Sequence, residues 1–277
     1  MPEGDTIFRA ARSLHNALAG HVVTRFETAY AHLDRVNVDT PIAGRTVEKC
    51  ESAGKHLLIA FSGELVLRTH MRMNGSWHLY RHGERWWRAP QAMRVRIDTA
   101  DWVAVAFHVP VAELVTPRQL ETRDPVAQLG PDLLGVGFDR EEAVRRIIAS
   151  AARPIAMTLL DQRIVAGIGN VYKSEVLFLC GVHPEAPSSA VPLPVLDAMV
   201  DTARRLLGDS VVEGSSARIQ TYRNLRQLNA ATEHDESLWV YGRRGKPCRR
   251  CGAPIEMKTM GLDARSTYWC PQCQTMR

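Results

Sequence analysis

Four cysteines near the C-terminal end of the chain have the spacing of a metal site. Cys248 and Cys251 form one C-x-x-C pair, and Cys270 and Cys273 form a second pair further along the chain. Two such pairs roughly 15 to 20 residues apart are typical of a tetrahedral zinc site. We predict one structural Zn²⁺, because four thiolate ligands leave no coordination position for water or a substrate.

The predicted zinc segment is strongly basic. It is too short to bury a core, so the metal should supply its folding free energy, on the order of 10 kcal/mol. Residues 241–277 contain eight arginines and lysines against two acidic residues, and a basic zinc hairpin is a common nucleic-acid-binding element. Arg265 lies between the cysteine pairs, where we expect the hairpin tip. On this segment alone, a phosphate contact and a solvated arginine are equally compatible with Arg265.

The stretch Met1-Pro2-Glu3 offers a different kind of chemistry. We expect Met1 to be removed, which leaves the secondary amine of Pro2 beside the Glu3 carboxylate. An α-amino group has a pKa of roughly 8, the lowest of the protein amines, and a free amine can condense with a sugar aldehyde to give an iminium. Considered locally, the same residues also suit a plain helix start, where proline and acidic residues are favoured.

Two glycines precede a predicted helix in the segment DQRIVAGIGNVYKSE. Gly167 and Gly169 allow positive φ and the close approach of another backbone. Asn170, which follows them, is suited to cap the helix. It is equally suited to hold a phosphate together with the amides at the helix N-terminus.

The composition is that of a folded globular protein with a moderate positive charge. The 277 residues are 45% hydrophobic and 23% charged, with a net charge of +5, which suggests a polyanionic partner without proving one. No apolar run approaches the roughly 18 residues that span a bilayer, and the first 20 residues do not form a signal peptide. We therefore expect a cytosolic protein with no membrane partner.

Three regions with different patterns follow one another. A helix is predicted from Asp5 to Leu18, with Asp5 or Thr6 as its cap. From residue 22 to about residue 108, short alternating strands separated by turn residues indicate a β-sandwich or barrel. From about residue 120 the pattern becomes helical, and Asp139 is a plausible cap for the first of these helices. The polar stretch from Ser215 to Glu236 is predicted to be a mobile loop.

Five stretches of the sequence together resemble one enzyme family. PEGD at the N-terminus, GKHLL, LLDQRIVAGIGNVYKSEVLF, VYGRRGKPC and ARSTYWCPQCQ are similar to motifs of the formamidopyrimidine-DNA glycosylase/endonuclease VIII family, with PEGD closer to the endonuclease VIII branch. The resemblance covers the whole chain and implies an α+β fold. An antiparallel β-sandwich with a flanking helix would occupy residues 1–122, a helix–two-turn–helix domain residues 123–238, and a zinc-finger hairpin residues 239–277.

The resemblance also implies an activity. The chain would be a bifunctional DNA glycosylase/AP lyase of base excision repair that binds damaged DNA and removes oxidised bases, pyrimidines above all. We expect it to be a monomer in the bacterial cytosol or nucleoid. Pro2 would attack C1′ of the deoxyribose, Glu3 would assist ring opening and proton transfer, and Lys55 would contact a phosphate and help to expel the base. The resulting iminium acidifies the C2′ proton, so the 3′ phosphate leaves by β-elimination and the 5′ phosphate can follow by δ-elimination.

Three further residues match positions that contact the DNA in this family. Asn170 and Arg265 match the residues that clamp the phosphates flanking the lesion, with Arg265 counted in the catalytic set, and Met73 matches a side chain that fills the gap left by the flipped nucleotide. The chain departs from the family at Asp5 and Thr6, where many members have proline and glutamate, and no role is assigned to either. The sequence FHVPVAEL occupies the position where the 8-oxoguanine branch has an RRFG-like segment. Fewer side chains would therefore assist Met73 in filling the gap left by the flipped nucleotide.

Other functions are compatible with parts of the sequence. A non-catalytic binder of damaged DNA on this scaffold should have lost Pro2, Glu3 or Lys55, yet all three are present. A zinc-ribbon RNA-binding or ribosome-associated protein would leave Pro2 and Glu3 unexplained. A glycosylase specific for 8-oxoguanine or formamidopyrimidine is a third alternative. Borohydride trapping separates the enzyme from the binders, because a binding module gives no covalent adduct with DNA.

Overall fold

The computed structural model describes residues 2–122, 125–212, 219, 221–222 and 237–276. It divides into two compact units, residues 1–128 and residues 129–277. Within the described residues, no helix is both long and apolar enough to cross a membrane. The domain boundaries predicted after residues 122 and 238 stay predictions, and most of the loop predicted from Ser215 to Glu236 lies outside the described residues.

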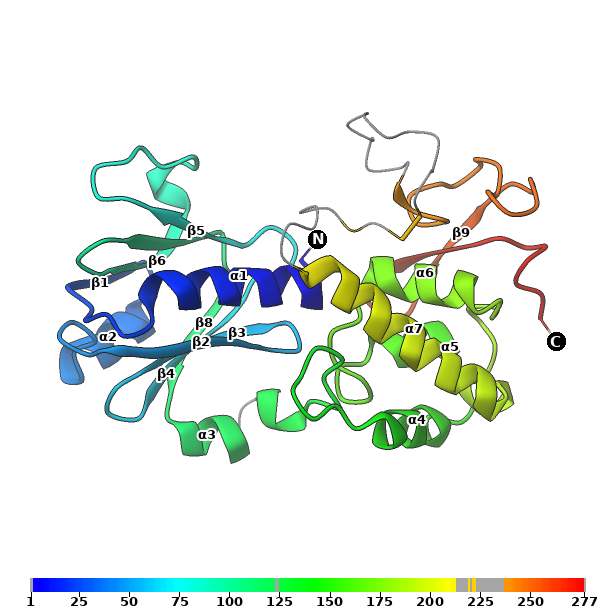
Figure 1. Cartoon of the computed structure of the whole chain (residues 1–277), viewed down its shortest axis with the longest axis horizontal. Coiled ribbons are helices and arrows are strands. Elements are labelled where there is room, and N and C mark those ends of the chain that lie inside the picture. Colours follow the sequence, from blue (N-terminus) through cyan, green and yellow to red (C-terminus); the bar gives the residue numbers. More distant parts are fainter. Residues whose placement is uncertain (1, 123–124, 213–218, 220, 223–236, 277) are drawn as a thin grey trace. The chain divides into compact units, whose positions relative to one another are not determined.

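The first unit is a sandwich of two antiparallel sheets, as predicted (Figure 1). One sheet has the strand order β1-β6-β7-β5 and the other the order β2-β3-β4-β8. The strands are β1 (Arg25–Thr28), β2 (Val47–Ala53), β3 (His56–Phe61), β4 (Leu65–His70), β5 (Ser76–Tyr80), β6 (Met93–Asp98), β7 (Val103–Phe107) and β8 (Val111–Val115).

The alternation of side chains along β3 explains how the sandwich is filled. Leu57 and Ile59 belong to the core between the sheets, together with side chains of β6 and β7. Leu58 and Ala60 point to the other face, where they pack with Val66 and the segment that follows β8. That segment includes α3 (Pro117–Thr122). Since both faces of β3 are covered, its sequence is apolar throughout rather than alternating.

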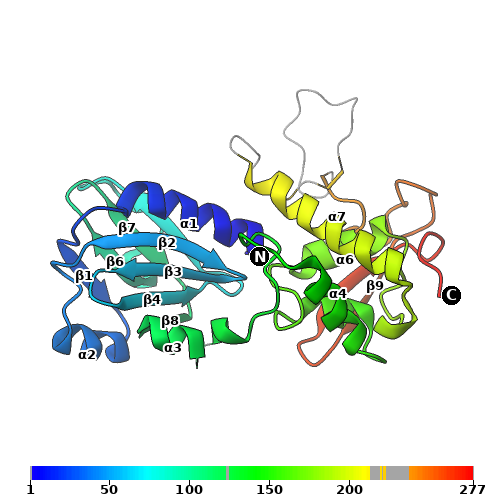
Figure 2. The same cartoon turned by 60° about the horizontal axis from the view of Figure 1, so that its bottom comes forward.

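The helix at the N-terminus, α1 (Gly4–Leu18), lies along β2 (Figures 1 and 2). Its apolar side chains recur every three or four residues, and Ile7, Leu14 and Leu18 are buried in the sandwich core. The predicted cap is wrong, because the helix begins at Gly4 and Glu3 occupies the N-cap position.

Helix α2 (Ala31–Asp39) was not predicted, because it lies in the region assigned to strands. Only Leu33 of this helix is buried, so the apolar repeat that reveals an amphipathic helix is missing. Contacts from elsewhere hold the segment in place. The hydroxyl of Tyr30 donates to the carbonyl of Val109, and Asn37 Oδ1 accepts from the amide of Ile42 at 3.0 Å.

The second unit is helical and ends in a two-stranded hairpin, as predicted. Its helices are α4 (Arg140–Ala149), α5 (Ile155–Leu160), α6 (Asn170–Leu179) and α7 (Leu193–Val211), followed by β9 (Glu256–Met260) and β10 (Arg265–Trp269). The predicted cap of α4 is confirmed, since Asp139 Oδ1 accepts from the amide of Glu142 at 2.8 Å. Every residue of α6 from Asn170 to Phe178 is buried, because α5, α7 and β10 all contact this helix.

Candidate active site and nucleic-acid interface

Four of the predicted site residues belong to one end of the first unit. Helix α1 runs antiparallel to β2, where the amide of Cys50 donates to Nδ1 of His15 at 3.2 Å. From His15, α1 extends about 16 Å back to its first residue, Gly4. From Cys50, β2 extends about 10 Å in the same direction to its last residue, Ala53. The turn that carries Lys55 therefore lies at the same end as Pro2 and Glu3 (Figure 2).

The first turn of α1 holds two buried carboxyl side chains. Glu3 is fully buried at the N-cap, where the positive end of the helix dipole stabilises a carboxylate, and Pro2 before it is partly exposed. Asp5 is also fully buried. Its carboxylate forms an ion pair with Arg9 at 3.2 Å and accepts from the hydroxyl of Thr6 at 3.4 Å. Asp5 is one of the positions at which the chain differs from many members of the family, and in the structure its side chain forms an ion pair within α1.

Lys55 neighbours two histidines that were not singled out in the sequence. Burial lowers the pKa of His56 to about 3, with further contributions from the charges of His70, Arg68 and Arg72. Burial also lowers the pKa of His70 to about 4, assisted by the charges of Arg72 and Lys55. The two rings meet edge to face at 4.8 Å. Both imidazoles are therefore neutral at neutral pH, and the positive charge at this end of the sheet comes from the lysine and the arginines.

Met73 protrudes from a tight turn between β4 and β5. The amide of Gly75 donates to the carbonyl oxygen of Met71 at 2.9 Å, and a Cβ at position 75 would lie 2.5 Å from that oxygen. Glycine is therefore required there. Met71 is 2% exposed and anchors the turn, whereas Met73 is 55% exposed. Because His56 pairs with His70 across β3 and β4, this turn lies at the same end of the unit as Lys55.

In the second unit, a buried lysine joins Asn170 to the zinc hairpin. Lys173 is fully buried, and its Nζ donates to Asn170 Oδ1 at 2.6 Å, to the carbonyl of Ser266 at 3.0 Å and to Thr267 Oγ1 at 2.8 Å. An ammonium group can only donate, so the amide oxygen of Asn170 must face it. The Nδ2 donor then points away from Lys173. The predicted capping role of Asn170 is wrong, because Gly169 occupies the N-cap.

Arg265 is the first residue of β10, beside the loop that joins the hairpin strands. Its side chain is 34% exposed and lies 3.5 Å from a carboxylate oxygen of Asp263. Because Lys173 binds the next two residues of β10, the Lys173 network brings Asn170 and the start of this strand together.

The turn between α5 and α6 is held by a glutamine that sequence reasoning missed. Gln162 Nε2 donates to the carbonyls of Leu160 and Ile168 at 2.9 and 3.0 Å, and its Oε1 accepts from the amide of Gly167 at 3.1 Å. Gly167 has a φ of +106°, which only glycine adopts readily. Gly169 has an ordinary negative φ of −115°. The prediction that a glycine provides positive φ is therefore confirmed at Gly167 and is wrong at Gly169.

Glu175 is a second buried polar residue with a structural role that was not predicted from the sequence. It is fully buried on α6, and its carboxylate accepts from the amides of Trp239, Val240 and Tyr241 at 2.8 to 2.9 Å. It also accepts from the hydroxyl of Thr221. One carboxylate thereby ties α6 to the segment that enters the zinc finger. The available signal was an acidic residue inside the otherwise apolar stretch EVLFL.

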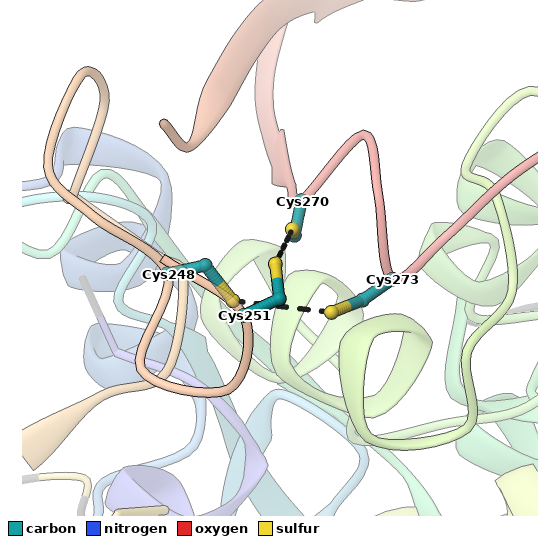
Figure 3. Close-up of side chains that lie close together, drawn as sticks. All are labelled: Cys248, Cys251, Cys270 and Cys273. Carbon is teal, nitrogen blue, oxygen red and sulfur yellow. Dashed lines mark hydrogen bonds between the residues drawn. The ribbon is translucent and has the colours of Figure 1, made fainter. Parts of the chain in front are cut away.

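The four cysteines converge as the spacing predicts (Figure 3). Their sulfur atoms all lie within 4.8 Å of one another, with Cys251 and Cys270 at 3.4 Å and Cys248 and Cys273 at 4.0 Å. A tetrahedral zinc ion with Zn–S bonds of 2.3 Å requires sulfur–sulfur distances of about 3.8 Å. The donor set therefore fits one structural zinc ion.

The comparisons with protein families cover most of the chain. The formamidopyrimidine-DNA glycosylase N-terminal domain matches residues 1–110, and the formamidopyrimidine-DNA glycosylase H2TH domain matches residues 129–221. The zinc finger found in FPG and IleRS matches residues 245–275.

Individual proteins match over nearly the whole chain. A probable endonuclease 8 2 of Streptomyces coelicolor is 40% identical over 99% of this chain and 94% of its own length. The DNA-(apurinic or apyrimidinic site) lyase Nei2 of Mycolicibacterium smegmatis is 38% identical over 99% of both chains. Among solved structures, the complex between Lactococcus lactis Fpg and DNA containing an abasic site superposes with a TM-score of 0.81. It is 25% identical and covers 99% of this chain and 100% of that one.

Proposed function

Because this chain belongs to the formamidopyrimidine-DNA glycosylase and endonuclease 8 family, we propose that it excises oxidised pyrimidines through an iminium ion formed on the Pro2 nitrogen. It is a DNA glycosylase with AP lyase activity in base excision repair, and it binds damaged DNA. The proposal adds the nucleophile, the class of lesion and the supporting residues. It also adds that the protein acts as a monomer in the bacterial cytosol or nucleoid.

The observation that carries the proposal is the arrangement of Pro2 and Glu3 at the start of α1. Once Met1 is removed, the Pro2 amine stands directly before the N-terminus of α1, where the helix dipole disfavours the protonated form of an amine. The fully buried Glu3 follows it in the chain and supplies a carboxyl group for proton transfer. Attack of the amine on C1′ forms the C–N bond as the damaged base leaves. The C2′ proton is then lost as the 3′ phosphate departs.

Lys55 and Met73 would act at the same end of the first unit. A lysine beside two neutral histidines supplies a point charge for a phosphate and for the departing base. Met73 projects from a turn whose shape is fixed by Gly75, so it can enter the duplex as an apolar wedge where the nucleotide is flipped out.

Asn170 and Arg265 would clamp the phosphates that flank the lesion. The Lys173 network fixes the side-chain oxygen of Asn170, which leaves its amide donor for a phosphate at the N-terminus of α6. Arg265 is the first residue of the strand that Lys173 also binds. The positions of both phosphate-binding residues, Asn170 and Arg265, would therefore depend on the buried ammonium group of Lys173.

The preference for pyrimidines rests on the sequence. PEGD resembles the endonuclease VIII branch, and the RRFG-like segment of the 8-oxoguanine branch is replaced by FHVPVAEL. In the structure this stretch runs from the end of β7 into β8, with Val109 buried in the sandwich core. A specificity for 8-oxoguanine or formamidopyrimidine is the competing outcome.

Borohydride trapping on lesion-containing oligonucleotides tests the proposal. The wild-type protein should form a covalent adduct and nick DNA that contains thymine glycol or dihydrouracil more efficiently than DNA that contains 8-oxoguanine. Pro2→Gly should keep its affinity for an abasic-site analogue and lose most of the trapped adduct. A protein with an N-terminal extension left in place should behave in the same way, because its Pro2 nitrogen is an amide.

Two controls make the result decisive. Undiminished trapping by Pro2→Gly would show that another amine is the nucleophile. Arg265→Ala should weaken binding on every sequence and flatten its salt dependence by about one phosphate contact. An unchanged salt slope would remove Arg265 from the phosphate clamp without affecting the assignment of Pro2.

A further inference from the structure

The loop between β5 and β6, residues 81–92, can be followed in Figure 1, and it carries one partly buried and one exposed tryptophan ring beside the buried cluster that includes Tyr80 and Phe107. Trp86 turns inward, with its ring 5.5 Å from Phe107 and 6.3 Å from Tyr80. Trp87 turns outward and is 83% exposed. Its amide donates to the hydroxyl of Tyr80 at 3.2 Å, and its ring meets His78 edge to face at 5.8 Å. The Trp87 ring therefore contacts His78 and Tyr80 edge to face and leaves most of its surface open to solvent.

Two exposed arginines flank the tryptophan pair in the sequence. The loop and the start of β6 contain four arginines and one glutamate. Arg85 and Arg88 flank the two tryptophans and are exposed, and neither side chain has a hydrogen bond or ion pair with any residue that the structure describes. Arg81 behaves differently, because it stacks on Trp102 at 3.7 Å. Burial lowers the pKa of His78, and the charge of Arg88 lowers it further, so this guanidinium acts electrostatically on the histidine.

We propose that this surface, the Trp87 patch (His78, Arg85, Trp87 and Arg88), binds an unpaired stretch of DNA beside the lesion. A base stacks on Trp87, and Arg85 and Arg88 contact the phosphates on either side of it. Exposed aromatic rings set among cations are the usual platform for single strands, because every base has a stacking face. An acidic peptide would be attracted by the arginines but would leave the flat Trp87 ring without a matching group.

The patch is close enough to the proposed lesion site to act on the same DNA molecule. His78 lies on β5, which begins three residues after Met73. Five residues of extended chain span at most about 17 Å, so a few nucleotides can bridge the distance between Met73 and the patch. The inference rests on the proposed function for its lesion site. It adds a second contact that favours lesions in partly unwound DNA, such as bubbles or duplexes with single-stranded flanks.

Fluorescence anisotropy on paired substrates tests the patch. One substrate is a blunt duplex with an uncleavable abasic-site analogue, and the other adds a single-stranded flank of about 12 nucleotides, the size of a single-strand site. The wild-type protein should bind the flanked duplex about tenfold more tightly than the blunt one. Trp87→Ala should bind both equally, and Trp87→Phe should restore most of the difference. Because Trp87 is exposed, these substitutions remove no core packing.

The two arginines give a second, independent readout. The double variant Arg85→Ala/Arg88→Ala should lose the advantage of the flank and lower the salt slope for the flanked duplex by about 1.4, since each single-strand phosphate contact contributes about 0.7. A charge-matched control, Arg35→Ala/Arg118→Ala, changes exposed residues of α2 and α3 and should leave the advantage intact.

The outcomes separate the patch from the proposed function. If the wild type binds the blunt duplex but gains nothing from the flank, or if Trp87→Ala keeps the gain, the patch is overturned and the lesion site stands. Binding of a labelled polyglutamate peptide that depends on Trp87, with no gain from the flank, would overturn the assignment to DNA in favour of a protein partner. Failure to bind the blunt duplex at all would instead contradict the proposed function.

Discussion

The ammonium group of Lys173 lies 2.6 Å from the side-chain oxygen of Asn170, one turn apart on α6. The same group binds Ser266 and Thr267 on β10, so it links a helix to a strand more than 90 residues away. In our proposal Lys173 does not bind the DNA. Its effect on DNA binding would be indirect, through the orientation of the Asn170 amide and the position of Arg265.

Replacing Lys173 with methionine should therefore weaken DNA binding as well as the fold of the second unit. Three acceptors lose their donor, each at a cost of roughly 1–3 kcal/mol, so we expect a loss of at least about 3 kcal/mol in the free energy of unfolding of the second unit. Affinity for an abasic-analogue duplex should fall tenfold or more, even far below the unfolding temperature. Thr267→Val removes one acceptor and should have a smaller effect. A double-mutant cycle with Asn170→Ala should show strong coupling, and additive losses would mean that Lys173 does not act through Asn170.

The buried carboxylate of Glu175 gives a prediction about stability alone. Glu175→Gln keeps the shape but replaces an acceptor of four hydrogen bonds with an amide that must turn a donor toward backbone N–H groups. We expect a loss of about 2–4 kcal/mol in the free energy of unfolding of the second unit. Urea unfolding followed by tryptophan fluorescence would measure it, since Trp239 is one of the partners. Glu141→Gln, an exposed residue of α4, is the matched control and should change stability little.

The neutral histidines near Lys55 predict an acid-sensitive first unit. The native pKa of His56 is about 3 and its ordinary value is 6.5, so the unfolded chain binds a proton that the native state excludes. The free energy of unfolding is therefore highest above about pH 6.5 and falls as the pH is lowered toward 3. At pH 5, His56 alone accounts for a loss of about 2 kcal/mol.

Urea unfolding at pH 7.5 and 5.0 would measure this loss in the wild type and in His56→Gln. The variant should lose about 2 kcal/mol less than the wild type between the two pH values, whatever the substitution does to stability at pH 7.5. Equal pH dependence in the wild type and His56→Gln would show that this histidine is protonated in the native state.

The sequence was informative where a local pattern is sufficient. The cysteine spacing defines the zinc ligands within a short segment, and the three-to-four-residue repeat in α1 indicates its buried face. Asn170 shows where local rules fail. Its residue type and position favour a helix cap, but a lysine one turn later binds its side chain, and that lysine is buried only because β10 packs on α6.

The same reasoning applies to the residues that the sequence did not reveal. The backbone partners of Glu175 follow it by more than 60 residues, and His56 meets His70 because β3 and β4 pair in that register. Helix α2 lacks a buried stripe, so its identity depends on contacts with other segments. These features come from contacts between distant residues, and no local spacing encodes them.

Removing the zinc ion should disturb the Lys173 network as well as the zinc finger. Trp269, the last residue of β10, directly precedes the ligand Cys270, so loss of the metal frees the strand that carries the acceptors of Lys173. Because the metal supplies folding free energy on the order of 10 kcal/mol, a chelator should abolish hydrogen-exchange protection in β9 and β10. Protection at the start of α6 should fall with it, whereas β3 in the first unit should keep its protection.

Zinc content and affinity for the abasic-analogue duplex should decline together during this titration. Cys270→Ser should reproduce both losses without a chelator. Cys180→Ser is the matched control, because Cys180 lies in the same unit and is not among the four clustered cysteines, so this variant should retain its zinc and its affinity. If the protein bound the duplex with full affinity after verified loss of zinc, the finger would have no part in holding Asn170 and Arg265 in place. If β3 lost its protection as well, the metal would be stabilising the whole chain rather than the second unit.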